Sequence, residues 1–134
     1  MREKYLTLTA EIAAFLCIFF ASIQGALLAV GFLILMDTFT GIWSAIRIDG
    51  LKSITSRKAG RIIVKLVLYP LAIIVAKVAQ DHLAPSIPWV DVTAGILAMI
   101  EVKSIFENMG GILGFDLWTR VKKAIWKDKQ EEAK

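Results

Sequence analysis

The 134-residue sequence has little of what soluble enzymes and disulfide-stabilised proteins depend on. Its one cysteine, Cys17, excludes an intramolecular disulfide framework and a cysteine-based metal site. Its one histidine, His82, excludes His-rich metal sites and catalysis by a histidine pair. Charged residues make up only 21% of the chain, whereas 57% is hydrophobic and the mean hydropathy is +0.64. A small soluble domain needs more polar material than this to cover its surface.

This composition predicts one membrane domain over residues 1–134 and argues against a soluble enzyme, a disordered chain or a nucleic-acid-binding domain. The net charge of +4 would hint at nucleic acid on a soluble protein. In a membrane protein it raises instead the question of which side of the bilayer holds the basic residues. We expect no cofactor and no metal.

The longest apolar stretch lies near the N-terminus. The 25 residues of Ile12–Met36 contain no charge, and a membrane span needs about 20 such residues. The apolar character continues to Ile46, which is too long for one untilted span, and Gln24-Gly25 is the natural break. We therefore predict two apolar helices here, over about 8–23 and 26–47. A cleaved signal peptide is the alternative, but the stretch that follows is apolar too.

Three further segments follow the N-terminal stretch. Two apolar helices are predicted over about 57–80 and 89–109, separated by a short turn that contains two prolines. The segment 115–128 places Trp118, Val121 and Ile125 at helical spacing among basic residues, which is typical of an amphipathic helix at a membrane surface. A plain solvated helix is the alternative for this tail. The fold class is all-α, with three to four apolar helices and a C-terminal amphipathic helix.

The distribution of charge predicts the orientation in the membrane. The loop 47–61 carries five basic residues and one acidic residue, 120–127 carries four basic residues, and 81–91 carries two acidic ones. Because Lys and Arg are retained on the cytoplasmic side, the loop 47–61 and the C-terminus are expected inside. A hairpin over 10–46 gives four apolar helices with the N-terminus inside, which we prefer; one long span gives three, with the N-terminus outside.

Charged residues inside the apolar helices are the most unusual feature of the sequence. An ionisable group at the bilayer centre costs about 2.5–3.5 kcal/mol on insertion scales, so such groups normally face protein or water. Lys77 and Lys103 lie where their long side chains can reach towards an interface. The side chains of Asp37, Lys65 and Glu101 lie too far from the helix ends to reach an interface.

Two helices carry a polar, small-residue face around these charges. Small residues let helix backbones approach in lipid, and Ser or Asn can hydrogen-bond across the interface. These faces predict helix packing, subunit assembly or the lining of a water-filled lumen. The alternative is intramolecular pairing of Lys65 with Asp37 or Glu101. The candidate residues are Asp37, Thr40, Gly41, Ser44, Lys65, Glu101, Ser104 and Asn108.

A second set of candidate residues is basic and flanks the apolar helices. Basic clusters next to membrane helices fix orientation and attract anionic lipid headgroups. These residues are Arg57, Lys58, Arg61, Arg120, Lys122, Lys123 and Lys127.

The sequence contains no constellation typical of an enzyme. The glycine-rich stretch 110–114 lacks the Lys-Ser/Thr pair of a phosphate-binding loop. His82 lies in a turn beside Asp81 with no nucleophile near it in sequence. We therefore expect no catalytic residues.

Two segments resemble phage holins of the toxin-secretion/phage-lysis class, holin family 4. Residues 36–45 resemble the D-x-x-T-G-x-x-x-A segment of that class, and residues 101–108 fit its E-x-x-S-I-x-E-N segment. A basic linker with Ser53, Ser56, Gly60 and Lys65 stands between them, although the Gly-to-Lys spacing is five rather than the four of the family's G-x-x-x-K. The resemblance covers about 26–109.

The resemblance implies a phage protein that oligomerises in the host's inner, cytoplasmic membrane and opens lesions that release an endolysin or a toxin. Its partners are then further copies of itself and membrane lipids; the endolysin is involved only indirectly, and nucleic acid is not. Two other classes stay open. A small four-helix transporter can use Glu11 or Asp37 as a proton and cation site, and a scaffold subunit only holds a partner. A holin kills a cell that expresses it, a transporter protects it, and a scaffold does neither.

Overall fold

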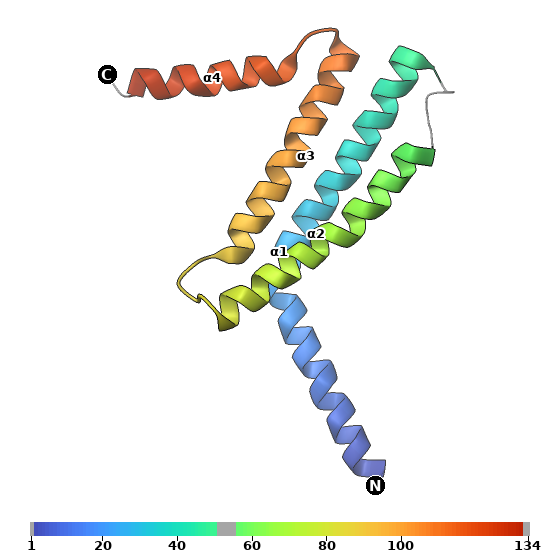
Figure 1. The fold of residues 1–134 in the computed structure, drawn as a ribbon, viewed down its shortest axis with the longest axis vertical. Coiled ribbons are helices and arrows are strands. Elements are labelled where there is room, and N and C mark those ends of the chain that lie inside the picture. The colour runs from blue at the N-terminus through green and yellow to red at the C-terminus, as the bar shows by residue number, and fades with distance from the viewer. Residues whose placement is uncertain (1, 51–55, 133–134) are drawn as a thin grey trace.

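A computed structural model describes residues 2–50 and 56–132, and both ranges are built from α-helices (Figure 1). Their bounds are α1, Arg2–Asp49; α2, Ser56–His82; α3, Trp89–Leu113; and α4, Leu117–Glu132. The all-α fold predicted from the sequence is confirmed. Three helices are long and largely apolar, and the short α4 has its apolar residues on one face, as expected for the amphipathic tail.

The predicted break at Gln24-Gly25 is wrong, because α1 is one continuous helix of 48 residues. A rise of 1.5 Å per residue makes it about 72 Å long. A glycine inside a helix costs only about 0.5–1 kcal/mol relative to alanine, and the good helix formers on both sides offset that cost. The helix changes direction where its N-terminal part leaves the bundle, but it does not break (Figure 1). The described chain thus has three apolar helices instead of the preferred four.

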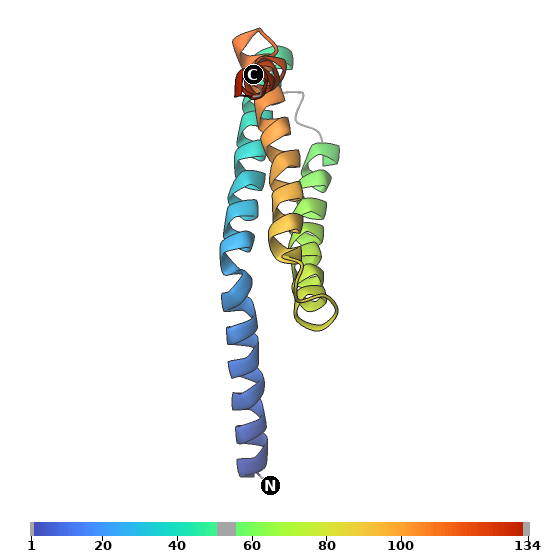
Figure 2. The same ribbon diagram turned by 90° about the vertical axis from the view of Figure 1, so that its left-hand side faces the viewer.

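The N-terminal part of α1 projects beyond the other helices as a free arm (Figures 1 and 2). We call residues 5–22 the arm; the first buried residue of α1 is Ile23, and large apolar side chains of the arm such as Phe15 and Ile18 are 66% and 73% exposed. The apolar segment Thr7–Ile48 is 42 residues long, about twice what a bilayer crossing requires. The arm is apolar on all sides, which suits lipid better than water.

The C-terminal half of α1 forms a three-helix bundle with α2 and α3. The three helices lie side by side in both views, with the α2–α3 turn at one end and the C-terminal end of α1 at the other (Figures 1 and 2). The apolar core lies near the turn. Its buried residues are Ile23, Val30 and Ile34 of α1, Ile73 and Ala76 of α2, and Val90 of α3.

By length and composition, Thr7–Ile48 and Gly60–His82 are able to cross a membrane. Helix α3 is similar in length and apolar overall, but its four charged residues set it apart from these two segments. Most large apolar side chains on the outside of the bundle are exposed, including Phe32, Val67 and Ile96. Such an outer surface is normal against lipid tails, which are as apolar as leucine.

Helix α4 leaves the bundle crosswise at the end opposite the α2–α3 turn (Figure 1). Gly114 ends α3 in the left-handed conformation, with φ of 77°, and its N–H donates to the carbonyl oxygen of Gly110. Asp116 then caps α4, because its carboxylate accepts from the backbone N–H of Thr119 at 2.9 Å and from the Thr119 hydroxyl at 2.7 Å. Trp118 packs on Phe106 of α3 with ring centroids 6.1 Å apart. These contacts fix the corner between the two helices.

Candidate functional site

The charged side chains of Asp37, Lys65 and Glu101 meet in the bundle, and each belongs to a different helix. Lys65 of α2 lies between the two carboxylates: its Nζ donates to Asp37 Oδ2 at 2.7 Å and to Glu101 Oε2 at 2.8 Å. The pairing considered as the alternative for these residues is therefore present. One ammonium group ties all three helices together.

Glu101 is the most deeply buried of these groups, with an exposed fraction of 0%. It is the thirteenth of the 25 residues of α3, so it lies halfway along the helix. Its second oxygen, Oε1, accepts a hydrogen bond of 2.7 Å from the hydroxyl of Tyr69. Tyr69 follows Lys65 by four residues on α2, and one helical turn places both side chains on the same face.

Sequence reasoning missed Tyr69 because an aromatic residue in an apolar helix is common. The spacing Lys65-x-x-x-Tyr69 was the available signal.

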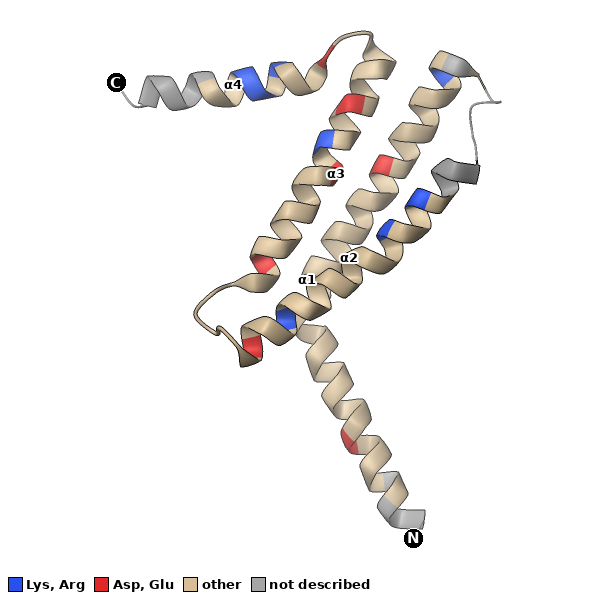
Figure 3. Cartoon of the chain, viewed as in Figure 1, with Lys and Arg blue, Asp and Glu red and all other residues tan. Residues whose placement is uncertain are grey.

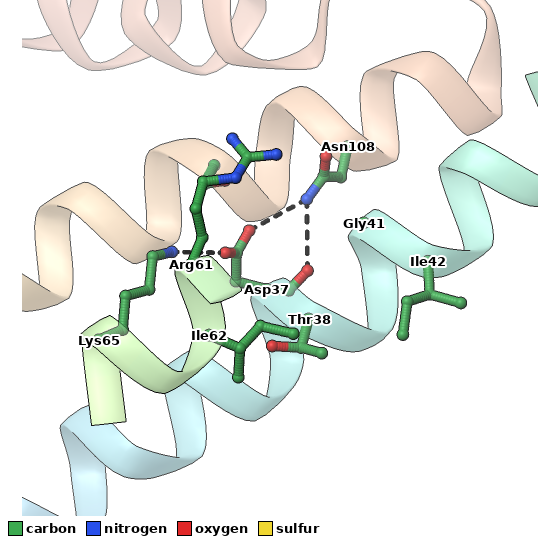
Figure 4. Close-up of a pocket in the computed structure, with 9 residues that line it drawn as sticks. Asp37, Thr38, Gly41, Ile42, Arg61, Ile62, Lys65 and Asn108 are labelled. Carbon is green, nitrogen blue, oxygen red and sulfur yellow. Dashed lines mark hydrogen bonds and ion pairs between the residues drawn. The ribbon is translucent and has the colours of Figure 1, made fainter. Parts of the chain in front are cut away.

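Asn108 completes the group from the α3 side. Its amide Nδ2 donates to Asp37 Oδ1 at 3.0 Å and lies 3.4 Å from the backbone carbonyl oxygen of Asp37 (Figure 4). The same nitrogen lies 3.4 Å from Thr40 Oγ1. Gly41 makes this approach possible, because a Cβ at that position would lie 3.3 Å from the same nitrogen. We call Asp37, Lys65, Tyr69, Glu101 and Asn108 the polar cluster. Each of its four carboxylate oxygens accepts a hydrogen bond.

The two predicted polar faces of α1 and α3 pack against each other beyond the cluster as well. Ser44 is 8% exposed, and a Cβ built on Gly111 would lie 2.9 Å from its Oγ. The Thr40 hydroxyl donates to the carbonyl oxygen of Met36 on its own helix, and its oxygen lies 3.4 Å from Asn108 Nδ2 of α3. The structure thus brings predicted residues of both faces to one interface.

A pocket of about 240 Å³ opens beside the cluster, between α1, α2 and α3 (Figure 4). Its polar lining includes Asp37, Lys65, Ser104 and Asn108, and Arg61 lies one turn before Lys65 at the same pocket. Glu101 is not part of the lining. The lining is apolar over its larger part, and the volume is enough for several water molecules, since each occupies about 30 Å³ in the liquid.

The other intramembrane lysines do not join the cluster. Lys77 pairs with Asp81 at 2.7 Å, and Lys103 pairs with Glu107 at 2.9 Å, both four residues apart on one helix. The second pair is half exposed on the outer side of α3. Glu101 and Glu107 accordingly point to different sides of α3.

Five of the described basic residues lie at one end of the bundle: Arg47 in the last turn of α1, Arg61 near the start of α2, and Arg120, Lys122 and Lys123 of α4 (Figure 3). Lys65 and Lys103 lie along the bundle, and Lys77 lies near the α2–α3 turn. Asp81 and Asp91 flank the α2–α3 turn at the opposite end. The side chains of Arg57, Lys58 and Lys127, which are predicted to contact lipid, lie outside the described part of the structure.

Outside the membrane-spanning helices, hydrogen bonds at the start of α4 favour the ionised form of Asp116. The backbone N–H of Thr119, and then its hydroxyl, hold the pKa of Asp116 below its usual value, because both donate to the ionised carboxylate.

Within residues 2–50 and 56–132, no group of three His, Cys, Asp or Glu residues is arranged to hold a metal ion. Cys17 is exposed on the arm and His82 is exposed at the end of α2. The fold and site define a small helical membrane protein whose polar residues connect helices.

Comparison with known families identifies the class further. The profile of the bacteriophage holin family matches residues 14–129, most of the chain, and the chain belongs to this family. No curated protein and no solved structure matches it. Members of the holin family are non-enzymatic membrane proteins that form lesions in the host's cytoplasmic membrane for lysis. The family predicted from the two sequence segments is confirmed.

Proposed function

We propose that the chain forms its lesions as a homo-oligomer. In this oligomer the polar faces of α1 and α3 no longer pack against each other and instead line a water-filled lumen. The observation that carries this proposal is the polar cluster, because it concentrates the intramembrane charges on the inner sides of helices whose outer sides are apolar. Larger lesions of this kind release an endolysin or a toxin without a direct contact with it.

The energetics support two alternative arrangements of the same residues. In the closed bundle, Asp37 and Glu101 are compensated by Lys65 and by hydrogen bonds. In a ring of several copies, lumen water solvates the same groups while the apolar sides stay in lipid. An intermediate with the carboxylates in lipid is costly, since each charge costs about 2.5–3.5 kcal/mol at the bilayer centre. This cost favours an abrupt, collective opening over a gradual one.

We further propose that the basic end of the bundle faces the cytoplasm. The C-terminal end of α1, the start of α2 and α4 share this end, whereas Asp81 and Asp91 lie at the other. With three apolar helices, this orientation places the C-terminus inside and the arm on the opposite side. Helix α4 then lies along the inner surface, where Arg120, Lys122 and Lys123 attract anionic lipid headgroups. The same role is proposed for Arg57, Lys58, Arg61 and Lys127.

Inducible expression in a bacterium tests the lesion proposal. We expect a delay and then an abrupt loss of membrane potential together with leakage of a cytosolic enzyme. The variant Glu101→Gln should change the time of onset, and His82→Ala, an exposed residue far from the cluster, should not. Loss of potential without enzyme leakage would contradict lesions of protein size. An unchanged potential would overturn the proposal in favour of a transporter or a scaffold.

A further inference from the structure

The outer side of α3 contains a second hollow, separate from the pocket beside the polar cluster. It is a groove of about 500 Å³ that follows α3 from Asp91 to Lys103. Trp118 of α4 also lines it and packs on Phe106, so α4 crosses the groove at its Lys103 end (Figure 1). We call this hollow the α3 groove. The residues between its ends are apolar or glycine, and all are exposed: Val92, Gly95, Ile96, Met99 and Ile100.

The α3 groove has the length and the chemistry of one lipid acyl chain. A rise of 1.5 Å per residue makes it about 18 Å long from Asp91 to Lys103. One leaflet contributes half of a hydrocarbon core that is about 30 Å thick. A Cβ built on Gly95 has nothing within 4 Å, so the missing side chain leaves the floor of the groove open. A chain of methylene groups therefore fits along this side of α3.

Helix α4 limits what else can fill the groove. A helix of a second copy that lay along α3 would meet α4 at Trp118, whereas a flexible acyl chain bends or ends below it. The side chains between the two ends of the groove carry no hydrogen-bonding group. An extended peptide there would leave backbone groups unsatisfied in the hydrocarbon region, which is costly. The shape and lining thus favour a lipid over a protein segment.

The two ends of the groove differ in charge. Asp91 lies at the end near the α2–α3 turn. At the other end, Lys103 lines the groove beside Trp118, and Lys122 Nζ lies 5.8 Å from the centre of the Trp118 ring. Lys103 pairs with Glu107, but both side chains are 52% exposed, and an ammonium group has three hydrogens to donate. An anionic headgroup is therefore attracted to the α4 end and repelled from the Asp91 end.

We propose that the α3 groove binds one anionic phospholipid, with an acyl chain along α3 and its phosphate at Lys103 and Lys122. The Trp118 ring lies between the apolar groove and these ammonium groups, a position typical of tryptophan at a membrane interface. This site differs from the general attraction of α4 for anionic lipid, because it requires the open groove as well as the charges. It does not depend on lesion formation.

Quenching of Trp118 by brominated lipid tests the site in the full-length chain. Trp43→Phe, Trp89→Phe and Trp126→Phe leave Trp118 as the one indole. The chain is placed in phosphatidylcholine vesicles that contain rising fractions of brominated phosphatidylglycerol or brominated phosphatidylcholine, because bromine on an acyl chain quenches a nearby indole. We expect half-maximal quenching at an about fivefold lower fraction of the anionic lipid, the gain from one basic residue near an anionic headgroup.

Two sets of variants separate the groove from a diffuse attraction. Gly95→Leu fills the groove without changing any charge and should bring the ratio of the two half-maximal fractions close to one. Gly31→Leu on α1 is the matched control, because a Cβ there also has nothing within 4 Å, and it should keep the fivefold ratio. Lys103→Gln and Lys122→Gln should each lower the ratio. Lys123→Gln removes a neighbouring charge of α4 that does not line the groove and should keep it.

Three results overturn the proposal. Equal half-maximal fractions for the two lipids would show that the site does not select an anionic headgroup. A preference that survives Gly95→Leu unchanged would assign it to the charges of α4 alone. The absence of quenching by either lipid would show that a second copy, and not lipid, covers the groove.

The experiment also distinguishes this inference from the proposed function. A chain that shows the Gly95-dependent preference but causes no leakage keeps the lipid site and loses the lesion proposal. A chain that causes leakage but lacks the preference does the reverse. Helix content measured by circular dichroism identifies any variant that fails to fold.

Discussion

Replacing Lys65 with methionine tests how much the bundle depends on the polar cluster. Lys65 supplies the one ammonium group that contacts both Asp37 and Glu101. Methionine retains most of the length and apolar stem of the side chain, so the change removes the charge and its hydrogen bonds with little change in packing. Two carboxyls then face each other across the helix interface without a cation between them.

The structure sets the expected magnitude. Removing one partner of a buried ion pair costs about 3–5 kcal/mol. The Lys65 side chain is 25% exposed and the freed carboxyls can take up protons, which places the expected loss near the lower limit. We therefore expect the free energy of unfolding to fall by about 3 kcal/mol, which is roughly a hundredfold change in the unfolding equilibrium.

Reversible unfolding in mixed micelles, followed by circular dichroism, measures this loss. Lys77→Met is the matched control, because Lys77 lies on the same helix and forms only a local pair with Asp81. Such i,i+4 pairs contribute about 0.3–0.5 kcal/mol. A triple variant, Asp37→Asn with Lys65→Met and Glu101→Gln, should regain most of the stability, since it leaves no charge unpaired.

If the free energy of unfolding of Lys65→Met were no lower than that of Lys77→Met, the prediction would be wrong. The cluster would then be solvated in the closed state, and its burial between the three helices would not describe the protein in lipid.

Three other predictions follow from the structure. Gly110→Ala should destabilise the chain by about 1–3 kcal/mol in the same assay, because its Cβ would lie 2.8 Å from the carbonyl oxygen of Phe115; Gly95→Ala, with nothing within 4 Å, should not. Because the pKa of Asp116 is lower in the folded than in the unfolded chain, its stabilisation of α4 is fully present above the unfolded-state pKa and is lost as the pH falls through the folded-state pKa. Trp fluorescence of α4 should therefore change as the pH falls through this range. The Asp116→Asn variant should not show this pH-dependent change. Cys17 should resist a membrane-impermeant maleimide in intact cells and react after detergent treatment, because the apolar arm is stable only in lipid; labelling in intact cells would place the arm in water.

The pairing of the polar faces was predictable because it follows from helical spacing and from the cost of charge in lipid. Asp37 and Glu101 each begin a polar face on an otherwise apolar helix, and Lys65 is the nearest cation that cannot escape to an interface. Those two facts are enough to predict that α1, α2 and α3 meet around these residues.

Other features depend on contacts that no single segment of sequence contains. Whether α1 breaks or only changes direction around Gly25 depends on how its two parts are placed against the other helices, which is a property of the whole fold. The close approach of Gly111 to Ser44 depends on the register between α3 and α1. The contact of Tyr69 with Glu101 joins residues 32 positions apart in the sequence, on two different helices.

The reaction of introduced cysteines with a water-soluble thiol reagent tests whether the polar faces come to line a water-filled lumen. Single cysteines are introduced in a Cys17→Ser background at Thr40 and Ser44 of the polar face, and at Leu35 and Phe39, which are 59% and 55% exposed on the outer side of α1. We expect Thr40→Cys and Ser44→Cys to be protected from an impermeant thiol reagent before the onset of lysis and to react after it, while Leu35→Cys and Phe39→Cys stay unreactive throughout. Reaction at the outer positions instead, or no change at the polar ones, would contradict the account.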